Sequence, residues 1–176
     1  ILSHAYRPEI RARAKVYLKM DDGGQHQLPP VSQLVALHGD ARNGAQVFKN
    51  YCATCHQVNG EGTDFGPKLS EIGSKLSKEA LYTAIITPSA GISFGFDGYV
   101  FTLKDGTTRL GYISNETADE VTVKMIGGAS EQIKKSAIAE KKPYGSSLMP
   151  ATIAQSMSQQ QLVDLVEYLT TLKKGQ

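Results

Sequence analysis

The chain has 176 residues, of which 40% are hydrophobic and 20% charged, which suits a folded domain with a core and excludes wholesale disorder. Nineteen basic and seventeen acidic side chains give a net charge of +2, too balanced for an electrostatic nucleic-acid binder. Two cysteines are too few for a disulfide scaffold or a four-cysteine zinc site. No apolar run approaches the roughly 20 residues of a membrane-spanning helix, so we expect no transmembrane segment.

The first residues have the pattern of one amphipathic helix. Pro8 suits a first helical turn, and apolar residues follow at helical spacing, namely Ile10, Ala14, Tyr17 and Leu18. This helix should end near residues 21–24, and a Gln/Pro-rich linker follows through Pro30. Because the chain opens with Ile1 and a lone apolar stripe needs a covering surface, we expect residues 1–36 to be a helix and linker left from an upstream helical repeat.

Residues 39–95 are predicted to be helical. Asp40 can cap a helix that continues through Phe48 and Tyr51. A second helix is expected from Lys78 to Thr87, where Pro88 stops it.

Residues 96–142 change to a period of two. Apolar and polar residues alternate from Tyr99 to Leu103, and Asp105-Gly106 is a strong hairpin signal before a return strand. A second alternation runs from Val121 to Met125, and Gly127-Gly128 turns the chain again. This block therefore predicts a small antiparallel sheet of about four short strands.

The last block is a helix that begins at Ser158. Its apolar residues share one side, namely Leu162, Leu165, Val166 and Leu169. We therefore expect a mainly α domain over residues 37–176, with a β insertion at about 96–142, after the N-terminal helix and linker.

The two cysteines lie in the run Cys52-Ala53-Thr54-Cys55-His56. On a helix, positions i, i+3 and i+4 share a face, so both thiols and the imidazole can point at one object. This spacing is the attachment signature of c-type haem, in which the thiols form thioether bonds and the histidine binds the iron. The sequence therefore predicts one covalent haem c held by Cys52 and Cys55, with His56 as an iron ligand.

Three other interpretations of the motif are weaker. A redox-active Cys-x-x-Cys pair favours a βαβ context, whereas the flanks here are helical. A zinc site needs more ligands than two cysteines and His56 supply. A buried cysteine pair leaves the adjacent histidine unexplained. Because covalent haem is attached in compartments that receive exported proteins, we expect a periplasmic or otherwise extracytoplasmic protein.

Met149 is the candidate for the second axial ligand, a position that methionine often occupies in electron-transfer haem proteins. It lies in the loop 146–150, where Pro150 fixes the backbone. The other methionines are expected to pack in cores or at helix ends; they are Met20, Met125 and Met157. The remaining histidines are expected at the surface or in packing, although His38 is a conceivable rival ligand; they are His4, His26 and His38.

With these motifs in place, the chain resembles a class I cytochrome c. The resemblance rests on Gly44 and Phe48 before the cysteine motif, then on residues 66–69, 147–150 and 165–169. It implies a helical fold around one haem, in which the first helix crosses the last. It also implies that the carbonyl of Pro67 accepts a hydrogen bond from Nδ1–H of His56. The 93 residues from His56 to Met149 shorten to 46 without the 47-residue β block, a normal span for a small cytochrome c.

A narrower resemblance covers about residues 37–174. Residues 39–41, 86–92, 105–106 and 138–149 are similar to the haem-binding domain of planctomycete- and verrucomicrobial-type proteins. In that group the domain often ends a longer chain, after helical repeats or a β-propeller sugar dehydrogenase. The resemblance therefore implies a fused or partner dehydrogenase as electron donor.

Two functions follow as expectations. The first is electron transfer without enzymatic activity of its own, relaying electrons from a dehydrogenase to a downstream acceptor. The alternative is a haem-based sensor or small-ligand-binding domain with a displaceable sixth ligand. The β block, with seven basic and seven acidic residues, would cover a haem edge or serve as a docking surface. A weak dimer is also conceivable, because the N-terminal helix lacks a covering surface.

Overall fold

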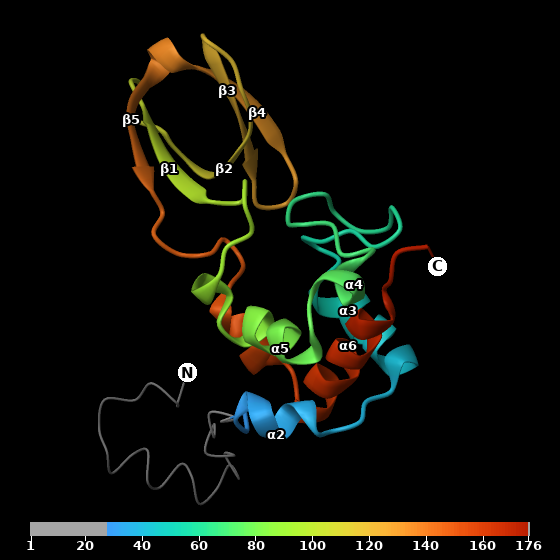
Figure 1. The fold of residues 1–176 in the computed structure, drawn as a ribbon. Helices are drawn as coiled ribbons and strands as arrows, with labels where there is room; N and C mark the ends of the chain where they lie inside the picture. The colour runs from blue at the N-terminus through green and yellow to red at the C-terminus, as the bar shows by residue number, and fades with distance from the viewer. Residues whose placement is uncertain (1–27, 176) are drawn as a thin grey trace, which may run out of the picture.

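The computed structural model describes residues 28–175, in which helices lie below a small antiparallel sheet (Figure 1). The helices are α2 (Val31–Val35), α3 (Ala41–Tyr51), α4 (Ile72–Lys75), α5 (Lys78–Ile86) and α6 (Gln159–Thr171). Three 3-10 helices lie in the connections between elements, η2 (Pro88–Ala90), η3 (Lys135–Ala137, between β4 and β5) and η4 (Ala151–Ser156). The strands are β1 (Gly98–Leu103), β2 (Thr108–Glu116), β3 (Glu120–Met125), β4 (Ser130–Lys134) and β5 (Ile138–Pro143).

The three longest helices begin at side-chain caps. The Asp40 carboxylate accepts hydrogen bonds from the N–H groups of Arg42 and Asn43, at 2.7 and 3.3 Å, and starts α3. Ser77 caps α5 and Ser158 caps α6, the latter with a reciprocal capping box to Gln161. These caps confirm the helices expected after Asp40, from Lys78 and from Ser158.

The core of the helical part is the crossing of α3 and α6. Gly44 makes the close approach possible, because a Cβ at this position would collide with the backbone of Asp164. The rings of Phe48 and Tyr168 pack against each other at the same crossing in a tilted arrangement, with centroids 5.8 Å apart. The four apolar residues predicted for the inner side of α6 are all buried, namely Leu162, Leu165, Val166 and Leu169.

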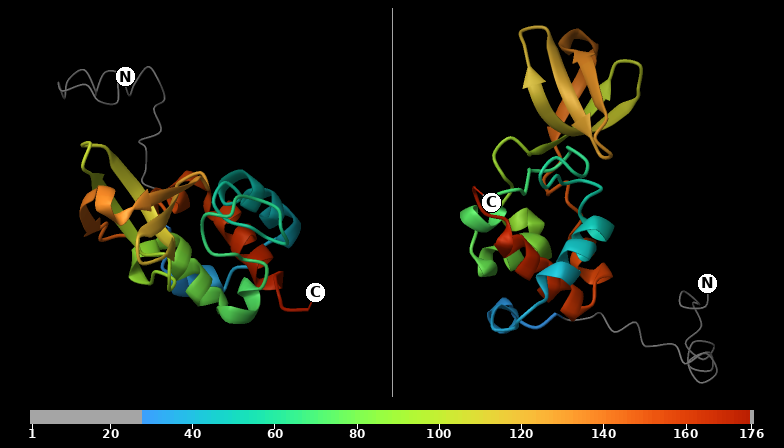
Figure 2. Two further views of the ribbon diagram at one scale, coloured as in Figure 1. Left: turned by 90° about the horizontal axis from the view of Figure 1, so that it is seen from above. Right: turned by 90° about the vertical axis from the view of Figure 1, so that its right-hand side faces the viewer.

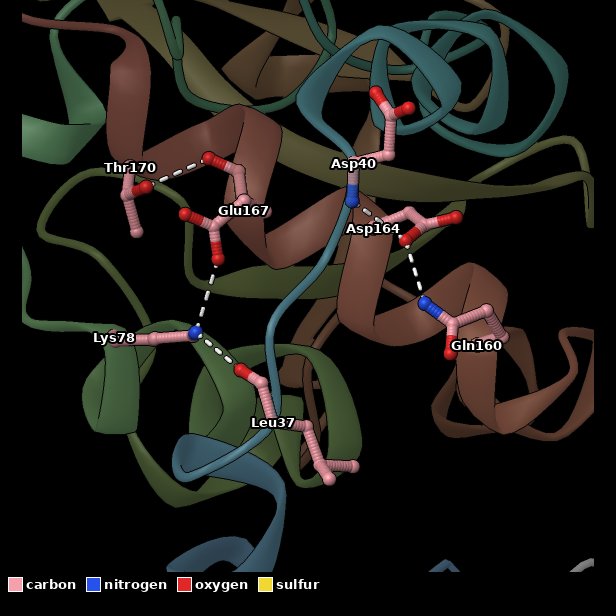
Figure 3. A network of polar contacts seen from close by, with 7 residues as sticks. All are labelled: Leu37, Asp40, Lys78, Gln160, Asp164, Glu167 and Thr170. Carbon is pink, nitrogen blue, oxygen red and sulfur yellow. Dashed lines mark hydrogen bonds and ion pairs between the residues drawn. The ribbon is translucent and has the colours of Figure 1, made fainter.

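The segment that enters α3 is tied to α6 by two carboxylates (Figure 3). Asp164, which is only 6% exposed, accepts hydrogen bonds from the backbone N–H of Asp40 and from Gln160. Glu167 pairs with Lys78 at 3.0 Å, and the same ammonium group donates to the carbonyl of Leu37. These bonds satisfy the buried carboxylate and fix the start of the helix that leads to the cysteine motif.

Helix α2 lies within the segment that the sequence analysis assigned to a linker. Its Leu34 is fully buried in the helical core, against α5. The predicted N-terminal helix lies outside the described residues, and the division of the chain at residue 36 stays a prediction. Among residues 28–175, no helix is both long and apolar enough to cross a membrane.

The sheet has the strand order β4-β3-β2-β1-β5, with every neighbouring pair antiparallel. It has its own small core, made by Phe101, Val121, Val123 and Ile133. The predicted Asp105-Gly106 turn joins β1 to β2, with Gly106 at a positive φ of 85°. The right-hand view of Figure 2 shows the sheet projecting above the helical part of the protein.

Two sequence expectations need correction. The sheet has five strands rather than about four, because β5 pairs along β1 although its sequence lacks apolar alternation. The expectation of a mainly α fold is only partly right, since 36% of the structure is helical and 23% is strand. The charged strand β5 is held by backbone hydrogen bonds at the sheet edge, a position that tolerates Lys and Pro.

Candidate haem site

An apolar cavity lies between the helices and the loop that follows the cysteine motif. Cys52, Cys55, His56 and Met149 all line it. The rest of its wall is mostly aliphatic and aromatic, and includes Phe48, Phe65, Leu69, Leu81, Ile85, Phe96, Tyr112, Ile153, Met157, Leu165 and Leu169. The structure thus brings the two thiols, the imidazole and the thioether to one cavity, although Met149 is 93 residues from His56 in the chain.

The cysteine motif forms a turn that continues the helical geometry of α3. The helix ends at Tyr51, but the amides of Cys55 and His56 both donate to the carbonyl of Cys52, at 3.0 and 2.9 Å. The i, i+3, i+4 arrangement expected from the sequence is therefore kept beyond the helix end. Burial, and then the neighbouring Cys55, raises the pKa of the Cys52 thiol to about 12, so this thiol stays protonated.

His56 is held as a neutral imidazole. Its Nδ1 lies 2.8 Å from the carbonyl oxygen of Pro67, which can only accept, so Nδ1 carries the proton. Burial lowers the pKa of His56, against the smaller opposing effect of this hydrogen bond. Nε2 therefore keeps its lone pair, and the bond to Pro67 is the orienting contact that an iron-binding histidine requires.

A Gly66→Ala substitution should disturb this imidazole. A Cβ at residue 66 would lie 2.5 Å from Cε1 and 2.8 Å from Nδ1 of His56, so the ring has to move away from Pro67. We expect a loss of about 1–3 kcal/mol in the free energy of unfolding, together with a changed haem absorption spectrum. Denaturant unfolding and spectroscopy measure both effects. Lys68→Ala, at an exposed position two residues away, is the control and should behave like the wild type.

Met149 reaches the cavity from a loop that other residues hold. Its backbone N–H donates to Oγ of Ser147 at 3.1 Å, and the amide of Ser147 donates to Oγ of Ser89 at 3.0 Å. These bonds anchor the loop to the end of α5 and η2. Pro150 follows Met149 directly; its ring holds its own φ, here −67°, and restricts the backbone of Met149.

The other methionines and histidines differ from Met149 in their burial and in whether they line the cavity. Met157 also lines the cavity, but it is 2% exposed and packs in the helical core. Met125 packs in the sheet, and His38 is exposed and does not line the cavity. Met20, His4 and His26 lie outside the described residues. The ligand roles of His56 and Met149 stay predictions.

Sequence reasoning did not single out the aromatic part of the wall. Phe65, Phe96 and Tyr112 line the cavity from the loop after His56, from the linker into the sheet and from β2. The alternation in β2 placed Tyr112 on one face of the strand, but strand periodicity does not say what that face covers. Gly66 and Pro67, which are half-buried beside Phe65, could be identified from the sequence because they belong to a motif.

The sulfur and nitrogen donor atoms at the cavity, and its apolar wall, fit a covalently attached haem. Two thiols next to a neutral histidine would provide the attachment points and one axial ligand of a haem, and a thioether lines the same cavity. An apolar wall is what a porphyrin face requires. Gly66 leaves the space that the imidazole occupies, because a side chain there would fill it.

Comparisons with known proteins agree with this geometry. Residues 41–122 match the family model of cytochrome c. A stretch of 51 residues is 43% identical to a cytochrome c of Arabidopsis thaliana and covers 28% of this chain and 46% of that protein. A stretch of 59 residues is 34% identical to a cytochrome c-553-like protein of Synechocystis sp. and covers 34% of this chain and 55% of that protein.

The chain thus spans about half the length of the curated relatives it matches. Part of the chain is thus similar to cytochromes c. The family match ends inside β3, at residue 122, so β4, β5, the loop that carries Met149 and helix α6 lie beyond it.

Proposed function

We propose that this chain is an electron-transfer domain with one covalently bound haem c. The observation that carries the proposal is the arrangement of Cys52, Cys55, His56 and Met149 around one apolar cavity, with Nδ1 of His56 fixed on Pro67. The cytochrome c family match supports the same function. When bound, the haem would supply an iron centre that is oxidised and reduced by one electron.

Each residue of the site has a part in this proposal. Cys52 and Cys55 would form the two thioether bonds, His56 would bind iron through Nε2, and Met149 would bind through sulfur. A methionine–histidine ligand pair raises the reduction potential relative to two nitrogen ligands. The apolar wall excludes water and so favours the less charged, reduced state of the site.

The proposal extends to the electron donor and to the compartment. The resemblance to planctomycete- and verrucomicrobial-type domains supports a dehydrogenase, fused or separate, that delivers electrons which pass to a downstream acceptor. Covalent haem supports a periplasmic or otherwise extracytoplasmic location. The chain itself would not be an enzyme.

A redox titration combined with carbon monoxide exposure tests the proposed function. The wild-type protein should show one reversible one-electron transition, and its reduced spectrum should not change under carbon monoxide, because Met149 fills the sixth position. Ready binding of carbon monoxide by the wild type would instead favour the sensor or small-ligand-binding alternative.

A further inference from the structure

We propose that the inserted sheet is a functional wall of the haem pocket, in which Tyr112 closes the cavity and the ion pair between Lys124 and Asp64 holds it closed. This inference rests on the proposed function, because it assigns a role toward the haem. It goes beyond that function by giving the sheet residues a specific part in setting the reduction potential.

The first observation is an aromatic cluster that joins three separate segments at the cavity. The ring of Tyr112, in β2, lies between Phe96 and Phe65, with centroid separations of 4.9 and 5.6 Å. Phe65 is 4% and Tyr112 is 7% exposed, and all three rings line the cavity. Aromatic rings at such separations attract one another beyond the effect of the area that they bury. The cluster therefore binds the sheet to the wall of the pocket.

The second observation is an ion pair that lies next to the aromatic cluster. Lys124, in β3, pairs directly with Tyr112 across the two strands. Its ammonium group lies 2.7 Å from the carboxylate of Asp64, and its side chain is only 15% exposed. Two neighbouring residues of the sheet thus contact two neighbouring residues of the loop, Asp64 and Phe65. This pairing fixes how the sheet sits on the loop.

The loop that receives the sheet is itself bonded to the cysteine motif. The amides of Phe65 and Gly66 donate to the carbonyl of Cys55, at 3.2 and 2.6 Å, and the amide of Thr63 donates to the carbonyl of Ala53 at 2.8 Å. Near Thr63, the turn between β3 and β4 comes so close that a Cβ on Gly128 would lie 2.7 Å from its methyl group. The position of the sheet is thereby transmitted to the attachment turn.

The sheet also leads directly into the loop that carries Met149. After β5, the amide of Tyr144 donates to the carbonyl of Gly98 at 2.8 Å, which closes the base of the sheet. The chain then reaches Met149 within five residues. Figure 1 shows the sheet above the helices, with the loop after His56 on one side and the two linkers on the other. The sheet therefore contacts the loop after His56 and is joined through the chain to the loop that carries Met149.

Closing the cavity has a definite electrostatic consequence. An apolar surrounding penalises the more highly charged, oxidised state of the site, so exclusion of water raises the reduction potential. Loss of the Tyr112 ring, or of the contact that holds it, would admit water and lower the potential. The ring rather than the hydroxyl makes the aromatic contacts, so Tyr112→Phe should match the wild type.

The test compares variants of the holoprotein in matched pairs. Tyr112→Leu removes the ring at the cavity, and Tyr99→Leu removes a ring of the same sheet that packs on Phe101 and does not line the cavity. Lys124→Gln breaks the ion pair with the loop, and Lys135→Gln breaks a 2.7 Å pair between η3 and Glu116 of β2, away from the cavity. The readouts are the reduction potential and hydrogen exchange at the amides of Phe65 and Gly66.

We expect Tyr112→Leu and Lys124→Gln to lower the reduction potential and to speed exchange at these two amides at least tenfold. The two control variants should leave both readouts at wild-type values. Unchanged readouts in Tyr112→Leu and Lys124→Gln, or equal shifts in the controls, would overturn the inference while leaving the haem function intact. A wild-type protein without a haem spectrum would mean instead that the proposed function itself is wrong.

Discussion

A Met149→Ala variant is expected to lose the weak long-wavelength charge-transfer band that marks a methionine sulfur on ferric haem, and its reduced form should bind carbon monoxide. Alanine has no donor atom, while the loop keeps the backbone bonds that Ser147 and Ser89 provide, so the sixth position opens without loss of the fold. The reduction potential should fall, because methionine ligation raises it. Absorption spectra of the oxidised, reduced and carbon monoxide-treated protein measure these effects.

Met157→Ala is the matched control for this experiment. Met157 lines the same cavity but is 2% exposed within the helical core. Its truncation should leave the charge-transfer band in place and cost about 2–5 kcal/mol of stability, as other large-to-small core changes do. If the band survives in Met149→Ala and disappears in Met157→Ala, the axial ligand is Met157 and the assignment of the loop is wrong.

The second large effect is expected from replacing both cysteines. A Cys52→Ser, Cys55→Ser double variant should contain no haem that survives denaturation, since a serine hydroxyl does not form the thioether bond. Each single variant should keep one bond and retain its haem through acid–acetone extraction. Haem staining of denaturing gels separates these cases.

Thr54→Ala provides the control for the cysteine variants. Thr54 lies between the two cysteines, is exposed and does not line the cavity. It should retain covalent haem in full. Haem that stays on the double variant after denaturation would show that attachment does not depend on these thiols.

The helices around the site could be predicted from the sequence because their signals are local. Asp40, Ser77 and Ser158 each accept hydrogen bonds from amides two or three residues away, so capping residues mark the helix starts without knowledge of the fold. The hairpin at Asp105-Gly106 has the same local origin. The spacing within Cys52–His56 also survives in the structure, because a single helical turn sets it.

Strand β5 and the aromatic wall of the cavity could not be predicted, because they depend on contacts between segments far apart in the chain. Strand β5 has a charged sequence, and only its pairing with β1 makes it a strand. The place of Tyr112 in the cavity wall depends on Phe65 and Phe96, which lie 47 and 16 residues away in the chain. Met157 was predicted to pack at a helix end, and only the fold shows that it also borders the cavity. Local sequence patterns carry no information on such tertiary contacts.

The most direct test of covalent haem at Cys52 and Cys55 is the intact mass of the wild-type protein under denaturing conditions, after expression with export and c-type haem maturation. The polypeptide should be heavier than its sequence by the mass of one haem, and the haem absorbance should elute with it. Peptide mapping should place the added mass on residues 52–55. A polypeptide at the mass of its sequence alone, with both thiols free to react with an alkylating reagent, would contradict the account.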